Sequence, residues 1–228
     1  MSPHSPSASP SPASLGPAAL RELISRRVIP SPSAEPMRDW RRRLAGGEER
    51  SMRELFARPP VPAAVLVPIV DRADGLAVLL TQRSSRLPHH PGQISFPGGR
   101  LESTDADAVA AALRETEEEI GLPRSLVRVA GFLPDHLIPV SGYRVTPVVS
   151  FVDPRYELRL DPTEVDEAFE VPLGHFLDPT NHVARVREYA GEPIEFIDMP
   201  FGPRNIWGAT AGMLLTLYRL LRGEELAA

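Results

Sequence analysis

The stretch Arg114–Leu122 reads RETEEEIGL and carries acidic residues at positions 115, 117, 118 and 119. On a helix that turns by 100° per residue, Glu115, Glu118 and Glu119 fall within an arc of about 100°. Residues suited to pack inward gather on another side of the same helix: Val109, Leu113, Thr116 and Ile120. The spacing predicts a helix over residues 105–120 that presents three carboxylates beside a packed face.

The ends of this helix are signalled by residues that cap helices. Ser103, Thr104 and Asp105 are candidate N-caps, and Gly121 is a natural C-terminal stop. The acids lie near the C-terminus, where the helix dipole disfavours negative charge, and the chain has no lysine to offset them. A solvated acidic face is one interpretation. A bound hard cation such as Mg²⁺ or Mn²⁺ is the other, because such ions prefer carboxylate oxygen.

Composition excludes several classes of function. The 228 residues suffice for one ordinary domain with an appendage. With 30 acids against 25 bases, a basic nucleic-acid-binding surface is not expected. The absence of cysteine excludes disulfides, thiolate metal sites and cysteine nucleophiles. The uncharged stretch Asn205–Tyr218 is too short to span a bilayer, and no secretory signal is visible, so we expect a cytoplasmic protein without membrane partners.

Texture along the chain divides it into three parts. Residues 1–16 are rich in Ser, Pro and Ala and predict a disordered tail. Residues 17–60 predict a helical N-terminal extension, with helices over 18–28, 37–44 and 51–58. Residues 61–228 form the main domain and combine two substantial helices, 105–120 and about 205–221, with these strand candidates: 63–70, 76–83, 92–96, 126–133, 143–152, 182–190 and 194–199. This mixture predicts α/β or α+β layers with a mixed sheet.

The segment GGRLESTDADAVAAALRETEEEIGL resembles the Nudix box. The matching residues are Gly99 at its start and Arg114, Glu115, Glu118, Glu119, Gly121 and Leu122 at its end. Asp105 replaces a glutamate of the box with a spacing one residue different, and Thr116 replaces a usually aliphatic residue. The resemblance implies an α/β/α sandwich whose loop–helix–loop holds metal ions, and hydrolysis of a nucleoside diphosphate linked to another moiety.

A second signature directly upstream, LLTQRSSRLPHHPGQISFPGG, is similar to the segment that marks the coenzyme A pyrophosphatase branch of Nudix hydrolases. The matching residues are Leu79, Leu80, Thr81, Arg83, Ser84, Gly92, Ile94, Phe96, Pro97, Gly98 and Gly99. Pro88 stands where the branch has a later arginine, and Arg86 precedes it by two residues. The resemblance implies cleavage of coenzyme A or its derivatives to 4′-phosphopantetheine and adenosine 3′,5′-bisphosphate.

The resemblance also implies roles for the acids. Glu115 and Glu119 are expected to ligate the main Mg²⁺ or Mn²⁺, with Glu118 on a second ion or a metal-bound water and the Gly99 carbonyl completing the sphere. Arg114 is expected to orient these carboxylates by ion pairing. In PTEVDEAFEVP, read as a loop, Glu164 is the candidate general base; Glu119 is the alternative, and Glu164 could also be a loop acid without a catalytic role.

Substrate contacts are expected upstream of the helix. Arg83 and Arg86 are candidates for the 3′-phosphate of coenzyme A, with Gly98 close to the substrate, although Arg86 could equally be a solvated loop residue. His89 and His90 could touch a phosphate or could be ordinary exposed loop residues. The partner is a small nucleotide, and a homodimer is left open. Two alternatives remain: a Nudix hydrolase of ADP-ribose, NADH or a nucleoside triphosphate, and a non-catalytic Nudix-fold binding module.

Overall fold

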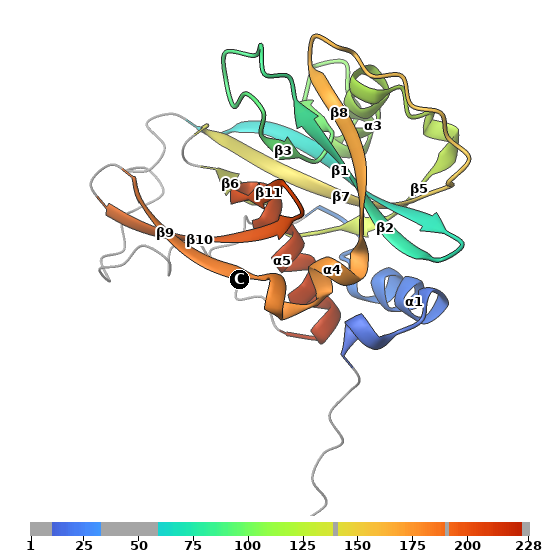
Figure 1. Cartoon of the computed structure of the whole chain (residues 1–228). Helices are drawn as coiled ribbons and strands as arrows, with labels where there is room; N and C mark the ends of the chain where they lie inside the picture. The colour runs from blue at the N-terminus through green and yellow to red at the C-terminus, as the bar shows by residue number, and fades with distance from the viewer. Residues whose placement is uncertain (1–10, 33–58, 139–140, 190–191, 225–228) are drawn as a thin grey trace, which may run out of the picture.

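The computed structural model describes residues 11–32, 59–138, 141–189 and 192–224 (Figure 1). The helices predicted over 37–44 and 51–58, and most of the tail predicted to be disordered, lie outside these ranges. Within the tail, Pro12–Ser14 forms a 3-10 turn, η1, with Pro12 buried. The disorder predicted up to residue 16 is therefore wrong for this turn, because its proline ring packs against the body of the protein.

The domain is built on a mixed eight-stranded sheet. Its central order is β3-β2-β1-β7-β5, with β4 beside β1, β6 beside β7 and β8 beside β2. The one parallel pair among the described strands is β1 with β7, from Val61 opposite Tyr143 to Val70 opposite Val152. The strands are β1 Val61–Arg72, β2 Gly75–Arg83, β3 Ile94–Ser95, β4 Gly98–Arg100, β5 Val127–Phe132, β6 His136–Ile138, β7 Tyr143–Val152 and β8 Val165–Pro172.

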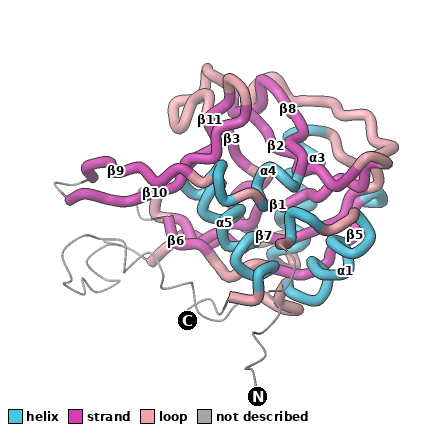
Figure 2. Tube along the Cα trace, turned by 60° about the horizontal axis from the view of Figure 1, so that its bottom comes forward, coloured by secondary structure: helices cyan, strands magenta, loops and turns pink. Residues whose placement is uncertain are grey.

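A second, three-stranded antiparallel sheet follows, made of β9 (Val183–Tyr189), β10 (Glu192–Phe201) and β11 (Arg204–Trp207). Figures 1 and 2 show β9 and the first part of β10 extending away from the body as a long hairpin. The other end of β10 returns to the body beside β11 and the start of the last helix.

Helices cover both faces of the large sheet and make three layers, α/β/α (Figure 1). One face carries α3, which packs with the apolar side chains of β1 and β7. The opposite face carries α5, together with α1 and α4. The helices are α1 Pro17–Arg27, α3 Ala108–Ile120, α4 Leu173–Leu177 and α5 Gly208–Arg222, with short 3-10 turns η3 Arg124–Leu126 and η4 Pro179–Asn181. The predicted mixed-sheet sandwich is thus confirmed.

The start of α3 corrects one prediction. Asp107, rather than Ser103, Thr104 or Asp105, is the N-cap, since its side chain accepts a hydrogen bond of 2.8 Å from the Ala110 backbone N–H. Asp105 is instead held by Arg114. At the other end Gly121 adopts φ 68° and ends the helix as predicted. This left-handed geometry favours glycine.

The segment predicted as a loop around Glu164 is partly wrong. From Val165 onward it is strand β8, paired antiparallel with β2. Three acids among its eight residues hide the alternation that normally reveals a strand, so the pairing with β2 decides the structure. The final helix likewise begins at Gly208, because the residues just before it form β11. No helix in the described ranges is long and apolar enough to cross a membrane.

Candidate functional site

Two consecutive glycines bring β4 against both β1 and α3. Gly98 has φ 147°, and a Cβ atom there would lie 2.4 Å from the backbone oxygen of Ala64. A Cβ on Gly99 would lie 2.5 Å from the carboxylate of Glu115. Gly98 therefore requires glycine, because its φ and its approach to the backbone of β1 both exclude a side chain, whereas a side chain at position 99 would displace the Glu115 carboxylate. The side chain of Glu115 rests directly on the backbone of β4.

Glu119 is the buried acid of the site, with only 4% of its surface exposed. Its Oε2 accepts a hydrogen bond of 3.1 Å from the Gly98 backbone N–H. Burial raises the pKa of Glu119 to about 8, with a further upward contribution from the charges of Glu164 and Glu115, while the Gly98 N–H and the charge of Arg83 act in the opposite direction. A buried carboxylate with one N–H donor and two acidic neighbours is well placed to bind a cation.

The other two acids of the predicted trio differ in exposure. The side chain of Glu115 is 18% exposed and that of Glu118 is 58% exposed. Burial raises the pKa of Glu115, Arg114 opposes this rise, and the charges of Glu118 and Glu164 add to it. The predicted arc of carboxylates therefore runs from solvent at Glu118 to the interior at Glu119.

Arg114 joins four groups around the start of the site. Its guanidinium pairs with Asp105 at 2.9 Å, Glu115 at 3.1 Å and Glu118 at 2.9 Å. It also donates to the carbonyl of Arg100 at 3.2 Å, which links α3 to β4. The hydrogen bond from Arg114 to Asp105 lowers the pKa of Asp105. Arg114 is thus placed where it could orient Glu115 and Glu118, as expected from the sequence. The ion pair with Asp105 holds its guanidinium in that place.

Glu164 enters the site from the loop 153–164, which precedes β8. Its backbone oxygen accepts a hydrogen bond of 2.7 Å from the Ser84 N–H, and the Asp161 N–H donates to the Glu119 carbonyl at 2.9 Å. The charge of Glu164 contributes to the raised pKa of both Glu115 and Glu119. The structure thus brings this acid from a distant part of the sequence into the same electrostatic environment as the helix acids.

The two predicted phosphate-binding arginines occupy different places. Arg83 ends β2, and its positive charge acts on Glu119. Arg86 instead donates a hydrogen bond to the Pro162 carbonyl, in the loop that carries Glu164. Its Nε also contacts the Ser84 hydroxyl at 3.4 Å. The guanidinium of Arg86 thus supports this loop, and the residue is exposed.

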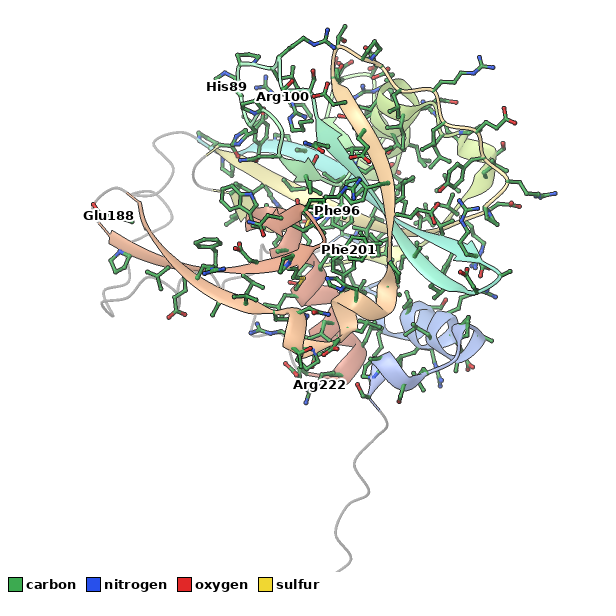
Figure 3. The ribbon with its side chains drawn as sticks, in the orientation of Figure 1. His89, Phe96, Arg100, Glu188, Phe201 and Arg222 are labelled. Carbon is green, nitrogen blue, oxygen red and sulfur yellow. The ribbon has the colours of Figure 1, made fainter. Side chains whose placement is uncertain are left out.

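The loop between β2 and β3 is otherwise open to solvent. Pro88, His89 and His90 are all exposed, and His90 has φ 57°. Figure 3 shows His89 on this loop, at the same end of the molecule as Arg100. Both histidines are exposed loop residues, and whether either of them contacts a phosphate stays a prediction.

In the described ranges, no group of three Asp, Glu or His side chains stands close enough to form a preassembled metal cage. The donors nevertheless fit a hard divalent ion in one respect: Glu119 is a buried carboxylate without an ion pair among the described residues, and Glu115 shares its arginine with Asp105 and Glu118. Burial of an anion whose charge is not fully offset is costly. Mg²⁺ normally takes only one or two protein carboxylates and completes its sphere with water and substrate phosphate oxygens. Glu115 and Glu119 are the residues that would hold it.

Several site contacts could not be found from residue types. They use backbone atoms: the Gly98 N–H, the carbonyls of Arg100 and Pro162, and the Asp161 N–H. A backbone donor carries no signature in the sequence. The ion pair between Asp105 and Arg114 was also missed, because the sequence placed Asp105 only as a candidate N-cap and as a replacement for a glutamate of the box.

Comparison with known proteins gives a consistent family. Residues 60–190 match the model of the NUDIX domain. A protein of Escherichia coli K12, described as an uncharacterized Nudix hydrolase NudL, is 43% identical over 159 residues, which cover 68% of this chain and 80% of the relative. Its counterpart in Shigella boydii serotype 18 is 42% identical over the same length.

Solved structures resemble the chain more distantly. DR0079 from Deinococcus radiodurans is 15% identical with a TM-score of 0.47, covering 72% of this chain and 85% of that one. The Ap4A hydrolase of C. elegans, in a binary complex, is 22% identical with a TM-score of 0.43, covering 49% of this chain and 80% of that one.

Proposed function

Because the chain belongs to the Nudix hydrolase family, we propose that it hydrolyses the diphosphate of coenzyme A and its derivatives with the help of Mg²⁺ or Mn²⁺. The observation that carries the proposal is that Glu115 and Glu119 lie against the glycines of β4, and that the charge of Glu164 acts on both of them. The upstream similarity to the coenzyme A branch, which includes Arg83 and Gly98, supports this choice of substrate. The products are 4′-phosphopantetheine, or its acylated form, and adenosine 3′,5′-bisphosphate.

When bound, a divalent metal would neutralise phosphate charge and favour the attack of water on phosphorus. Glu115, Glu119 and the Gly99 carbonyl would hold the metal, and Glu118 would bind a second ion or a water molecule. Arg114 fixes the direction of Glu115 and Glu118 through its ion pairs. Arg83 contributes positive charge toward the phosphates from the end of β2.

Glu164 is the proposed general base. It accepts the proton of the attacking water, the oxygen of that water bonds to phosphorus, and the bridging oxygen leaves with the second phosphate. Its support is positional: the loop reaches α3, and the charge of Glu164 acts on both metal-binding candidates. Glu119 is the alternative base, because its raised pKa of about 8 lies closer to neutral pH than the pKa of an ordinary glutamate.

A second substrate class is favoured by one specific observation. Pro88 replaces the branch arginine, and Arg86 is occupied by the Pro162 carbonyl. Of the two arginines predicted to bind a 3′-phosphate, Arg86 thus shares its guanidinium with this carbonyl, and Arg83 does not. A diphosphate without that group, such as ADP-ribose or NADH, would need no such contact. The metal chemistry is the same for both classes.

The test is a substrate panel with purified protein and either Mg²⁺ or Mn²⁺. Coenzyme A, acetyl-coenzyme A, ADP-ribose, NADH and ATP are compared by kcat/KM, with products identified by mass spectrometry. We expect coenzyme A and its thioester to be cleaved best. If ADP-ribose or NADH is hydrolysed efficiently and coenzyme A is not, the assignment to the coenzyme A branch is rejected. If compounds bind but none is hydrolysed, the protein is a binding module.

A further inference from the structure

The sequence Asp-Pro-Thr occurs twice in the chain, beginning at Asp161 and at Asp178, and both copies form the same turn. The Asp161 carboxylate accepts hydrogen bonds from the Thr163 N–H at 2.8 Å and from the Thr163 hydroxyl at 2.6 Å. The Asp178 carboxylate accepts from Thr180 in the same way, at 2.9 Å and 2.7 Å. The two turns therefore match in local structure, and they differ in what they connect.

The turn at Asp161 is joined to the C-terminal end of α3. The Asp161 N–H donates to the Glu119 carbonyl at 2.9 Å, and the Arg159 N–H donates to the Ile120 carbonyl at 2.8 Å. Carbonyls in the last turn of a helix have no partner within that helix. Gly121 permits the approach, because a Cβ atom there would lie 3.0 Å from the backbone of Arg159. The loop is thus fixed to the end of the helix that carries Glu119.

The same turn holds the backbone of Glu164. The Asp161 carbonyl accepts from the Glu164 N–H at 3.0 Å and from the Val165 N–H at 2.9 Å. On its other side the Glu164 carbonyl accepts from the Ser84 N–H, just after β2, at 2.7 Å. Asp161 therefore bonds directly to the backbone of both Glu119 and Glu164.

The turn at Asp178 lies elsewhere in the fold. Asp178 is the N-cap of η4, and its carbonyl accepts from the Asn181 N–H at 3.1 Å. The turn packs beside α4 and β10, on the α5 side of the sheet. Within the described ranges, no hydrogen bond joins it to α3. The second copy thus has the bonds of the turn without the connection to the carboxylates.

We propose that Asp161 is a positioning residue for the reaction, which fixes Glu164 relative to Glu119. This inference rests on the proposed function, in which Glu164 accepts the proton of the attacking water. The hydrogen bonds from Thr163 lower the pKa of Asp161, so its carboxylate is ionised at neutral pH and is a strong acceptor. Proton transfer requires the base at hydrogen-bond distance, so a small displacement of Glu164 lowers kcat while the substrate contacts remain.

Substitution of Asp161 tests this role against the matched turn. In Asp161→Ala we expect kcat for the best diphosphate substrate to fall by about 10- to 100-fold, with KM within about 3-fold, because a misplaced base affects the transition state and not binding. Asp161→Asn keeps an acceptor for Thr163 and should restore kcat to within about 3-fold. Asp178→Ala should leave kcat and KM within about 2-fold, because its turn is independent of the site.

A double-mutant cycle shows whether Asp161 acts through Glu164. Glu164→Gln alone should lower kcat by about 10²- to 10⁴-fold. Adding Asp161→Ala to that variant should lower kcat by less than about 2-fold more. An equal effect of Asp161→Ala in both backgrounds would overturn the proposal, since the residue would then act independently of the base. An unchanged kcat in Glu164→Gln would also overturn it, because there would be no base to position.

Hydrogen exchange measures the positioning without turnover. In Asp161→Ala the amide protons of Glu164 and Val165 should exchange on the order of 10-fold faster, because the turn that holds their acceptor opens more often. In Asp178→Ala they should not change. Unaltered exchange in Asp161→Ala would contradict the proposal.

The exchange data also reveal a variant that does not fold, because protection would then be lost throughout β1 and β7. In that case Thr163→Val takes the place of Asp161→Ala. It removes only the hydroxyl bond, and we expect kcat to fall by about 3- to 10-fold, the usual contribution of one hydrogen bond. An unchanged kcat in a folded Thr163→Val protein would then reject the role of Asp161.

Failure of this inference differs from failure of the hydrolase proposal. If none of the diphosphates in the substrate panel is hydrolysed, the reaction is rejected and the role of Asp161 with it. If a diphosphate is hydrolysed and the effects of Asp161→Ala and Glu164→Gln simply multiply, only the role of Asp161 is rejected.

Discussion

Helices α3 and α5 cover opposite faces of one sheet with different kinds of side chain. The buried residues of α5 are mostly large and apolar: Met213, Leu214, Leu215, Leu217, Tyr218 and Leu221, besides Thr210, Ala211 and Thr216. Those of α3 are mostly small or polar: Ala108, Ala111, Ala112, Thr116 and Glu119, besides Ile120. Small side chains allow α3 to approach β4 closely, and the glycines of β4 complete that approach.

The difference separates stability from chemistry. Burial of a Leu or Met side chain stabilises a fold by about 1.5 to 3 kcal/mol, and α5 contributes several such residues. Burial of a carboxylate is unfavourable unless a partner offsets its charge. The apolar side chains of α5 therefore contribute much of the stability of the domain. The buried carboxylate on α3 lowers that stability. Substitutions on the two faces should have opposite signatures.

The largest expected effect is the loss of catalysis in Glu119→Gln. Glutamine keeps the acceptor for the Gly98 N–H, so the fold should persist, but it removes the buried charge. We expect kcat for the best diphosphate substrate to fall by about 10²- to 10⁴-fold. Steady-state kinetics measures the fall in kcat, and a circular dichroism spectrum checks that the fold persists. Retained activity would show that the α3 face is not the reaction centre.

The same variant should be more stable than the natural chain at alkaline pH. The folded-state pKa of Glu119 is about 8, above its ordinary value of 4.5, so its ionisation disfavours the folded state. The resulting loss of stability develops as pH rises from about 4.5 to 8 and is constant above that. In EDTA at pH 9, Glu119→Gln should gain on the order of 3 to 5 kcal/mol in unfolding free energy.

Urea denaturation at pH 5 and pH 9 measures this gain. At pH 5 the two proteins should differ by less than about 1 kcal/mol, because pH 5 lies only half a unit above the ordinary pKa of 4.5 and little of the loss has developed. A stabilisation of equal size at both pH values would mean that something other than the buried charge distinguishes the variant.

The sequence predicted the α3 side better than the rest, and the reason is chemical. Glu115, Glu119, Arg114 and Gly121 carry side-chain or conformational requirements that leave a pattern in the residues. The cap at Asp107 was missed because several acids and hydroxyls precede the helix, and local sequence does not decide which one turns toward the Ala110 N–H. Strand β8 was missed because its pairing with β2 is a long-range event.

The α5 face should respond in stability and not in catalysis. Leu214 is 1% exposed, and Leu214→Ala should lower the unfolding free energy by about 2 to 5 kcal/mol through lost contacts and a residual cavity. Leu113→Ala on α3 is the comparison, and its loss should be smaller because Leu113 is only half-buried. Assayed well below its unfolding temperature, Leu214→Ala should retain kcat. A large fall in kcat would break the division between the faces.

The smallest effect concerns Arg86, where the sequence and the structure suggest different roles. If Arg86 binds the 3′-phosphate, Arg86→Ala should raise KM for coenzyme A and leave dephospho-coenzyme A, which lacks that phosphate, unaffected. The hydrogen bond to the Pro162 carbonyl instead makes Arg86 a support for the loop that carries Glu164. We therefore expect kcat to fall by about 3- to 10-fold on both substrates with little change in KM.

Arg128→Ala on β5 is the control for this last measurement, since it removes an exposed arginine that lies over the Phe151 ring, 4.9 Å from the ring centre. It should leave both substrates unchanged. Arg86→Lys adds a further distinction, because a lysine retains one donor for the carbonyl and should restore part of kcat. A rise in KM for coenzyme A alone would contradict the loop-supporting role. It would show that Arg86 binds the 3′-phosphate and that the β2–β3 loop is part of the substrate site.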